Sequence, residues 1–222
     1  FDNAREDDVY SGEVGFRTDF DTGSVGHRLI LSASVFSLES RNAYAFSDFF
    51  NQFEDDLYDP TQIEAPPADF FTGGSLSSPG VTYTTDTTSY AIADTMSFAD
   101  DRFLLTIGAR QQSLEGETFD YNTGERLSKY DESKLTPVGG VVYKPGETIS
   151  LYANYIEGLI AGDIPPTVAN GLPVANGGEA QDPYQAEQIE AGVKYDSGQY
   201  GATLSLFSIT RPFGVLEPYE DP

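Results

Sequence analysis

The sequence has no cysteine and no tryptophan, and it has one methionine and one histidine among 222 residues. The lack of cysteine excludes disulfide frameworks, thiol catalysis and cysteine-ligated zinc. Basic residues are scarce, because 12 Lys and Arg stand against 36 Asp and Glu, for a net charge of −24. Nucleic-acid binding needs clustered Lys and Arg, so nucleic acid is not expected as a partner. No apolar run approaches the ~18 residues of a membrane-spanning helix.

Aromatic residues, by contrast, are abundant. They make up 13% of the chain, as 15 Phe and 14 Tyr, although the mean hydropathy is negative at −0.34. A polar chain rich in rings and glycine is typical of strands with one apolar face and one wet face. The sequence begins at Phe1 with no stretch that resembles a signal peptide, and Glu217–Pro222 does not resemble a terminal strand. We therefore expect an internal piece of a longer protein.

Alternation of apolar and polar residues predicts an all-β chain. In the hairpin Asp182–Arg211, for example, Ile189, Ala191 and Val193 share one face of the first strand. Eight strands are predicted in total: Asp8–Phe20, Val25–Glu39, Thr88–Phe98, Phe103–Phe119, Leu135–Tyr143, Ile149–Glu157, Ala186–Tyr195 and Tyr200–Thr210.

The connections between these strands alternate between short and long. Tight turns are expected at 21–24, 99–102, 144–148 and 196–199, and long loops at Ser40–Thr87, Asp120–Lys134 and Gly158–Gln185. Short turns at one end and long loops at the other are typical of a transmembrane β-barrel. Every tight turn also has a Phe or Tyr beside it, as an interfacial girdle of rings requires.

One residue departs from the two-faced pattern of the strands. Phe103, Leu105 and Ile107 form an apolar face opposite Thr106 and other polar residues. Asp94, however, has the parity of the apolar positions Tyr90, Ile92 and Met96. Either a bulge shifts the register, or Asp94 lies near a membrane interface.

Three hairpins resemble those of one family, in the order in which they follow one another along the chain. The first joins Ser89–Phe98 to Asp101–Arg110, and the second joins Leu135–Gly146 to Ile149–Gly158. The third joins Tyr184-Gln-Ala-Glu-Gln-Ile-Glu-Ala-Gly-Val-Lys194 to Leu204–Thr210. They resemble barrel hairpins of TonB-dependent outer-membrane receptors, especially siderophore receptors. After the Gly-x-Arg at Gly108–Arg110, two glutamines stand where the family usually has an aromatic residue or Asp.

The resemblance implies that residues 1–222 are part of an antiparallel transmembrane barrel of about 22 strands, whose plug domain lies outside this chain. It implies uptake of a ferric siderophore across the outer membrane of a Gram-negative bacterium. The expected partners are this ligand, the outer-membrane lipid and the TonB complex, which the absent plug would engage. Neither a cofactor nor a resident metal is expected.

Two other architectures remain open. Eight strands can close a small barrel, which would have a structural or adhesive role. A soluble carbohydrate-binding β-sandwich would instead need one buried face on each sheet. The aromatic girdle opposes the sandwich, and the long loop Ser40–Thr87 opposes the small barrel.

The longest loop holds the candidate ligand-binding residues. Its rings either line the mouth of a ligand site or pack against neighbouring loops. Arg110, on the wet face of its strand, is the candidate partner for anionic groups of a ligand. The aromatic candidates are Tyr44, Phe46, Phe49, Phe50, Phe53, Tyr58, Phe70 and Phe71.

Catalytic and metal chemistry find little support in the sequence. His27 is the single histidine, and the sequence shows no nucleophile and orienting carboxylate for it, so the protein is not expected to be an enzyme. The carboxylates of the longest loop lack the spacing of a calcium loop, and prolines interrupt them, so we expect a solvated acidic segment. They are Glu54, Asp55, Asp56, Asp59, Glu64 and Asp69.

Overall fold

The computed structural model describes residues 1–50, 55–62 and 64–217, and the regular elements in them are β-strands. Within these residues, no helix has the length and apolar character needed to cross a membrane. The strands are β1 (Asp2–Thr22), β2 (Val25–Phe46), β3 (Phe71–Gly73), β4 (Gly80–Phe98), β5 (Phe103–Phe119), β6 (Arg126–Tyr143), β7 (Ile149–Ile160), β8 (Val168–Ala169), β9 (Leu172–Pro173), β10 (Tyr184–Asp196) and β11 (Gly201–Thr210).

The eight predicted strands are confirmed, and most are longer than predicted. β5 has the predicted bounds, whereas β2 continues seven residues beyond the expected end, from Glu39 to Phe46. The expected long loop Asp120–Lys134 is wrong, because β6 already begins at Arg126. The Asp120 carboxylate accepts hydrogen bonds from the backbone N–H groups of Asn122 and Thr123, both at 2.8 Å, and so closes a compact turn.

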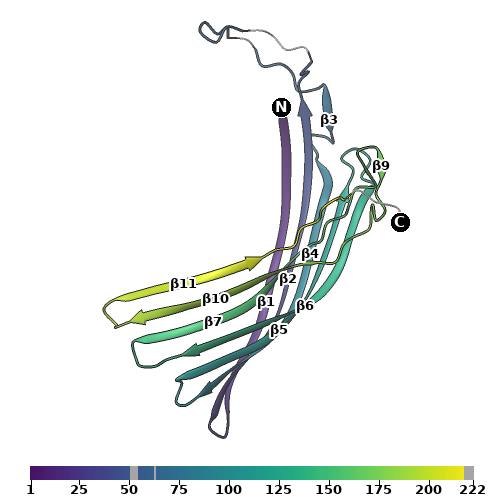
Figure 1. The fold of residues 1–222 in the computed structure, drawn as a ribbon. Coiled ribbons are helices and arrows are strands. Elements are labelled where there is room, and N and C mark those ends of the chain that lie inside the picture. Colours follow the sequence, from purple (N-terminus) through teal and green to yellow (C-terminus); the bar gives the residue numbers. More distant parts are fainter. Residues whose placement is uncertain (51–54, 63, 218–222) are drawn as a thin grey trace. The chain divides into compact units, whose positions relative to one another are not determined.

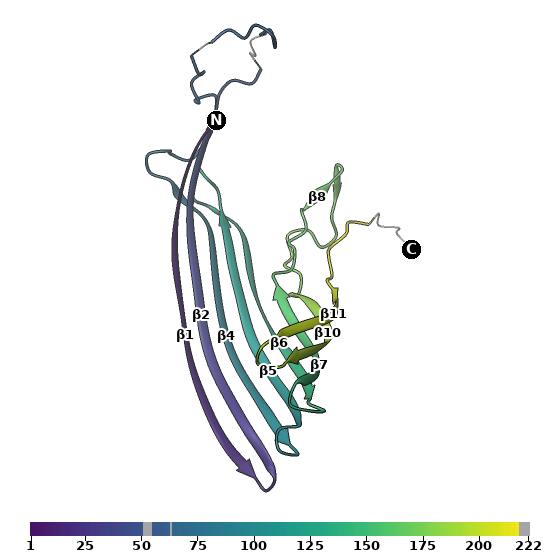
Figure 2. The same cartoon turned by 90° about the vertical axis from the view of Figure 1, so that its left-hand side faces the viewer.

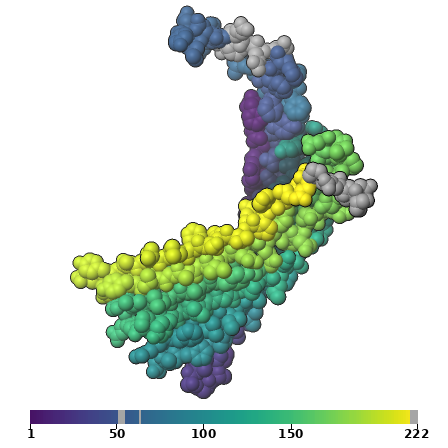
Figure 3. Space-filling view, viewed as in Figure 1, coloured from purple at the N-terminus to yellow at the C-terminus, as the bar shows by residue number. Residues whose placement is uncertain are grey.

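The long strands form one sheet in the order β1-β2-β4-β5-β6-β7-β10-β11, and β3 pairs with β2 (Figures 1 and 2). Long strands that follow one another in the chain are neighbours, and β10 and β11 run in contact along the sheet (Figure 3). β1 and β11 are the two ends of this order. The closed eight-stranded barrel would place these two strands side by side, so that alternative is not what the structure shows.

The chain divides into two compact units, which we describe separately. The loop unit comprises Phe1–Tyr10, Phe36–Asp86 and Gly116–Lys129, and it contains the longest connection. The turn unit comprises Ser11–Val35, Thr87–Glu115 and Tyr130–Pro222, and it contains the four tight turns of the sheet. Each long strand from β1 to β6 contributes residues to both units.

The tight turns of the turn unit use glycine and left-handed backbone. Gly23 has a φ of +64° at the first central position between β1 and β2, as a type II′ hairpin turn requires. Between β4 and β5, three consecutive residues that are not glycine have positive φ: Ala99, Asp100 and Asp101. Such residues cost roughly 1–2 kcal/mol each in this region of the backbone, a feature that the sequence did not reveal.

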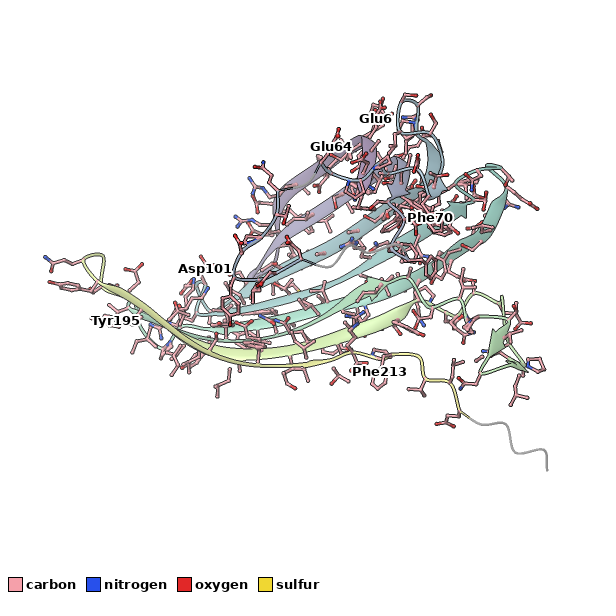
Figure 4. The ribbon with its side chains drawn as sticks, turned by 90° about the horizontal axis from the view of Figure 1, so that it is seen from above. Glu6, Glu64, Phe70, Asp101, Tyr195 and Phe213 are labelled. Atoms are coloured by element: carbon pink, nitrogen blue, oxygen red, sulfur yellow. The ribbon has the colours of Figure 1, made fainter. Side chains whose placement is uncertain are left out.

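The register of β7, β10 and β11 gives the sheet one apolar face and one polar face. Ala191 lies opposite Ala153 of β7 and Leu206 of β11, and the next positions on this face are also largely apolar. The opposite face is more polar, with Gln188, Glu190 and Lys194 on β10, although Phe207 and Ile209 of β11 lie on it too, and side chains project from both faces (Figure 4). The apolar rows from Ile189 to Tyr195 cover about 20 Å of strand at 3.4 Å per residue.

The apolar face is exposed rather than packed into a core. Among the described residues, the buried apolar side chains are Ala43, Ala45 and Tyr130. Val14, Ile107 and Leu206 on the apolar face are each more than half exposed. A soluble β-sandwich would bury such a face against a second sheet, so this arrangement does not support the sandwich. Exposed aromatic residues flank the tight turns, among them Phe20, Phe103, Tyr143, Tyr195 and Tyr200.

Candidate ligand-binding site

The longest connection leaves β2 and returns to β4, and a short pairing closes its base. β3 pairs antiparallel with the end of β2, so that Tyr44 lies opposite Gly73 and Phe46 opposite Phe71. The backbone N–H of Phe70 also donates to the carbonyl of Phe46, at 3.0 Å. A side chain at Gly73 would overlap the Tyr44 ring, so glycine is needed there for the ring to lie across β3.

Five rings meet at this base and form the base cluster: Phe1, Tyr44, Phe46, Phe71 and Tyr121. The Phe1 and Phe46 centroids are 4.6 Å apart, and Tyr44 contacts Tyr121 edge-on at 5.1 Å. Tyr121 comes from the β5–β6 turn, so these contacts join that turn to the base of the longest connection. The prediction that loop rings pack against neighbouring loops describes this cluster.

Three further rings form a separate outer cluster, made of Phe49, Phe50 and Phe70. The Phe49 and Phe50 centroids are 4.7 Å apart, and both rings contact Phe70 at 5.8–5.9 Å. Phe50 is 77% exposed, and Phe49 and Phe70 are each 49% exposed. The candidate Phe53 lies outside the described residues. The outer cluster is therefore a preassembled aromatic surface open to solvent, as a ligand contact requires.

Carboxylates surround Tyr58 in the same connection. Tyr58 is 94% exposed, and a shallow, open hollow of about 640 Å³ is lined by residues 55–59 and Thr61. The Asp55 carboxylate accepts from the backbone N–H of Thr61 at 3.0 Å, and Asp56 accepts from that of Tyr58 at 2.8 Å. These bonds order the segment and leave other lone pairs of both carboxylates open. Within the described residues, no three acidic or histidine side chains are grouped as a metal site.

Arg110 lies in the turn unit, on β5. The polar face of β5 is identified by Thr106, whose hydroxyl bonds that of Thr95 on β4 at 2.8 Å. Arg110 has the same parity, and its side chain is exposed. The aromatic candidates belong to the loop unit, so the structure does not join Arg110 to them in one site.

Sequence reasoning missed the pairing of Asp94 with His27 on the apolar face. His27 Nδ1 lies 2.7 Å from Asp94 Oδ2, its Nε2 contacts the Thr22 hydroxyl, and its ring stacks on Phe20 at 4.9 Å. The sequence had shown neither of these partners of His27. Asp94 lies 67 positions away in sequence, so the alternation of either strand alone gave no sign of the pair.

This group explains how a carboxylate occurs among apolar positions. Thr95 faces Thr106 on the polar face, so its neighbour Asp94 lies on the apolar face, as its parity predicts. His27 and Asp94 side chains are 15% and 28% exposed, and Asp94 Oδ1 is buried without a hydrogen-bond partner. The imidazole offsets part of the cost of removing the carboxylate from water. We assign the contact a structural role at the turn end of the sheet.

Comparison with known proteins adds independent information. A family model described as TonB dependent receptor-like, beta-barrel matches residues 1–212. The chain is 35% identical, over 211 residues, to the ferrichrome receptor FcuA of Yersinia enterocolitica. The aligned region covers 95% of this chain and 27% of FcuA. Its fold matches BauA, the ferric preacinetobactin receptor from Acinetobacter baumannii, with a TM-score of 0.77 and 33% identity, over 97% of this chain and 30% of BauA.

More distant structures share the fold alone. The unliganded ferric citrate transporter FecA has a TM-score of 0.64 and 16% identity, over 94% of this chain and 28% of FecA. The copper transporter OprC has a TM-score of 0.55 and 13% identity, over 91% of this chain and 29% of OprC. The chain thus spans less than a third of each of these relatives. A fold that accompanies such different cargo does not by itself identify a ligand.

Proposed function

The chain belongs to the TonB-dependent receptor β-barrel family, and from this membership we propose that it is a sector of an outer-membrane receptor that takes up a ferric siderophore. The observation that carries the ligand class is its 33–35% identity, over nearly the whole chain, to two receptors named for ferrichrome and ferric preacinetobactin. The cargo is the ferric complex, and the protein needs no cofactor of its own in this proposal.

The exposed apolar face supports the membrane part of the proposal. Lipid is the environment in which a face of half-exposed Val, Leu, Ile and Phe side chains is stable, because water is removed from them. The polar face would then line the lumen. The tight turns would lie on the periplasmic side and the loop unit on the extracellular side, where a ligand arrives. Coupling to the TonB complex would pass through parts of the receptor outside this chain.

Direct binding tests this function. The whole receptor that contains this chain, purified in detergent, should bind at least one ferric siderophore from a panel that includes ferrichrome and ferric preacinetobactin. Cells that depend on the receptor should accumulate iron-55 from the same complex only while the TonB complex is energised. Absence of binding to every ferric siderophore tested, with a correctly folded receptor, would refute the proposed ligand class.

The outer cluster is the proposed ligand contact. Replacing Phe49, Phe50 and Phe70 together by Ala should weaken binding about tenfold or more, because three rings of contact area are lost and rings near the centre of a binding surface commonly contribute over 1 kcal/mol each. The titration is run on the whole receptor by intrinsic fluorescence. The triple replacement of Val14, Ile107 and Leu206 by Ala is the matched control, since these side chains lie on the apolar face. Equal affinity of the Phe variant and the wild type would remove the outer cluster from the site.

The two faces should differ in their environment. Spin labels at Ile189, Ala191 and Val193 in the membrane-inserted receptor should collide with lipid-soluble oxygen, because these positions lie on the apolar face. Labels at Gln188 and Lys194 should collide with a water-soluble nickel chelate instead. Electron paramagnetic resonance measures both accessibilities, and the same values at all positions would contradict the lipid-facing assignment.

A further inference from the structure

We infer that the ligand-binding end of this receptor selects neutral or cationic iron(III) complexes and disfavours anionic ones. The inference rests on the proposed function, because it concerns the charge of the ligand that the loop unit meets first. Three observations carry it: the charge of the loop unit, the engagement of its basic side chains, and the composition of the exposed surface of its longest connection.

The loop unit is strongly acidic. It contains sixteen Asp and Glu residues and four Lys and Arg residues, although it holds about a third of the chain. A surface with such an excess of one sign attracts ions of the opposite sign and repels ions of its own sign over several ångströms. At 0.1 M ionic strength the interaction extends about 10 Å. An approaching anion therefore meets repulsion before it can touch a ring.

The basic side chains of the loop unit are already engaged. Arg5 pairs with Asp7 at 2.9 Å, Arg41 with Asp8 at 2.6 Å, and Arg126 with Glu117 at 2.8 Å. Arg41 also contacts Glu39, and the fourth base, Lys129, has an interaction partner too. An anionic ligand gains most from charge-assisted bonds to free guanidinium or ammonium groups. To obtain one from Arg5, Arg41 or Arg126, it would have to displace a carboxylate that is part of the protein.

The exposed surface of the loop unit instead offers hydrogen-bond acceptors and aromatic rings, which suit a neutral or cationic ligand. The open hollow of about 640 Å³ combines the carboxylates of Asp56 and Asp59 with the exposed ring of Tyr58. Carboxylates accept hydrogen bonds from ammonium, hydroxyl and amide N–H groups. Aromatic rings such as those of the outer cluster attract cations over their faces. A ligand with donors or a positive charge on its surface is thus complementary to both components.

The charge of the ligand is the variable to test. The whole receptor is titrated with four ferric complexes: a cationic linear trihydroxamate with a free ammonium group, neutral ferrichrome, ferric citrate and a trianionic tricatecholate. We expect the receptor to bind the cationic complex, the neutral complex or both. If the receptor binds the anionic complexes as tightly as these, or binds them alone, the inference is overturned while the proposed function survives. If it binds none of the four or of the wider siderophore panel, the proposed function itself is overturned.

A charge-neutralised variant links the selectivity to this surface. Asp56→Asn together with Asp59→Asn keeps side-chain oxygen acceptors and removes two negative charges. In stopped-flow measurements at low salt, this variant should reduce the ratio of association rates between cationic and anionic complexes about threefold or more, and added salt should reduce the ratio in the wild type as well. The matched control, Asp100→Asn with Glu147→Gln, removes two charges beside tight turns of the turn unit. Equal ratios in the wild type and the loop variant, or equal reductions in the loop variant and the control, would contradict the inference.

Discussion

Replacing Gly108 by Val should prevent the receptor from assembling a stable barrel. A Cβ atom at this position would lie 2.6 Å from the carbonyl oxygen of Ile92, 2.7 Å from Ala93 Cβ and 2.9 Å from Val138 Cγ1. The first of these is backbone of the neighbouring strand β4, which cannot rotate away as a side chain can. Overpacking of this kind typically costs 1–3 kcal/mol, and the two additional methyl groups of Val increase it, so we expect a loss of more than about 3 kcal/mol.

A second glycine provides the matched control for this prediction. A Cβ atom at Gly139 would have no neighbour within 4 Å, and Gly139 lies opposite Tyr155 on the apolar face. Gly139→Val should therefore assemble normally. Assembly is measured as the fraction of receptor in the outer membrane that runs as the compact, heat-modifiable form in detergent gels. If both variants assemble to the same extent, the close approach of β4 and β5 at Gly108 is not as the structure describes it.

The strands were predictable because each carries its own two-residue period. For β5, alternation of Phe103, Leu105 and Ile107 with polar neighbours was enough to give both bounds. Strand ends beyond the apolar rows were not predictable in this way. Beyond Glu39, polar contacts join β2 to its two neighbouring strands. Ser40 Oγ lies 2.6 Å from the Asp7 carboxylate of β1, and Asn42 Nδ2 lies 2.7 Å from the Thr82 hydroxyl of β4. Hydrophobic periodicity does not mark such a segment.

The false loop at Asp120–Lys134 has the same origin. This segment is rich in charged and polar residues, which in isolation indicate a loop. In the structure its polar side chains form cross-strand pairs, with Thr118 Oγ1 2.6 Å from Ser128 Oγ and Arg126 paired with Glu117. A strand with polar residues on both faces is stable there because its partners satisfy it. The side chains that pair with this segment belong to the neighbouring strand β5, about ten residues earlier in the sequence. The segment alone therefore does not predict a strand.

The sequence named candidate rings for a ligand contact but could not give their arrangement. Eight rings in one loop indicated an aromatic site, but not that Tyr44, Phe46 and Phe71 join the base cluster while Phe49, Phe50 and Phe70 form the outer cluster, because this depends on where β3 pairs with β2. That pairing joins Tyr44 to Gly73 and Phe46 to Phe71, positions that are 29 and 25 residues apart in the sequence. Of the two interpretations that the sequence left open, packing describes the base cluster, and ligand contact remains the proposal for the outer cluster.

In the pair of His27 and Asp94, the carboxylate depends more on its partner for stabilisation than the imidazole does. Asp94 lies among apolar neighbours, and one of its carboxylate oxygens is already without a hydrogen-bond partner. The other is held by His27 Nδ1 at 2.7 Å. Removing the imidazole would leave a carboxylate on the apolar face with little compensation, whereas removing the carboxylate would leave a small ring stacked on Phe20. The two single replacements should therefore have unequal effects.

His27→Ala should destabilise the receptor by about 2 kcal/mol or more, since breaking a desolvated pair leaves an uncompensated charge. Asp94→Ala should cost less, and the double replacement should recover part of the loss caused by His27→Ala, giving a coupling energy of about 1 kcal/mol or more in a double-mutant cycle. The cycle is measured from guanidinium unfolding of the receptor in detergent. The exposed pair of Arg28 and Asp19, at 2.8 Å with side chains 58% and 61% exposed, is the matched control, for which the same cycle should give no more than about 1 kcal/mol. Strictly additive effects of the His27 and Asp94 replacements would show that the two side chains do not stabilise each other, and Asp94 would then need another source of compensation on the apolar face.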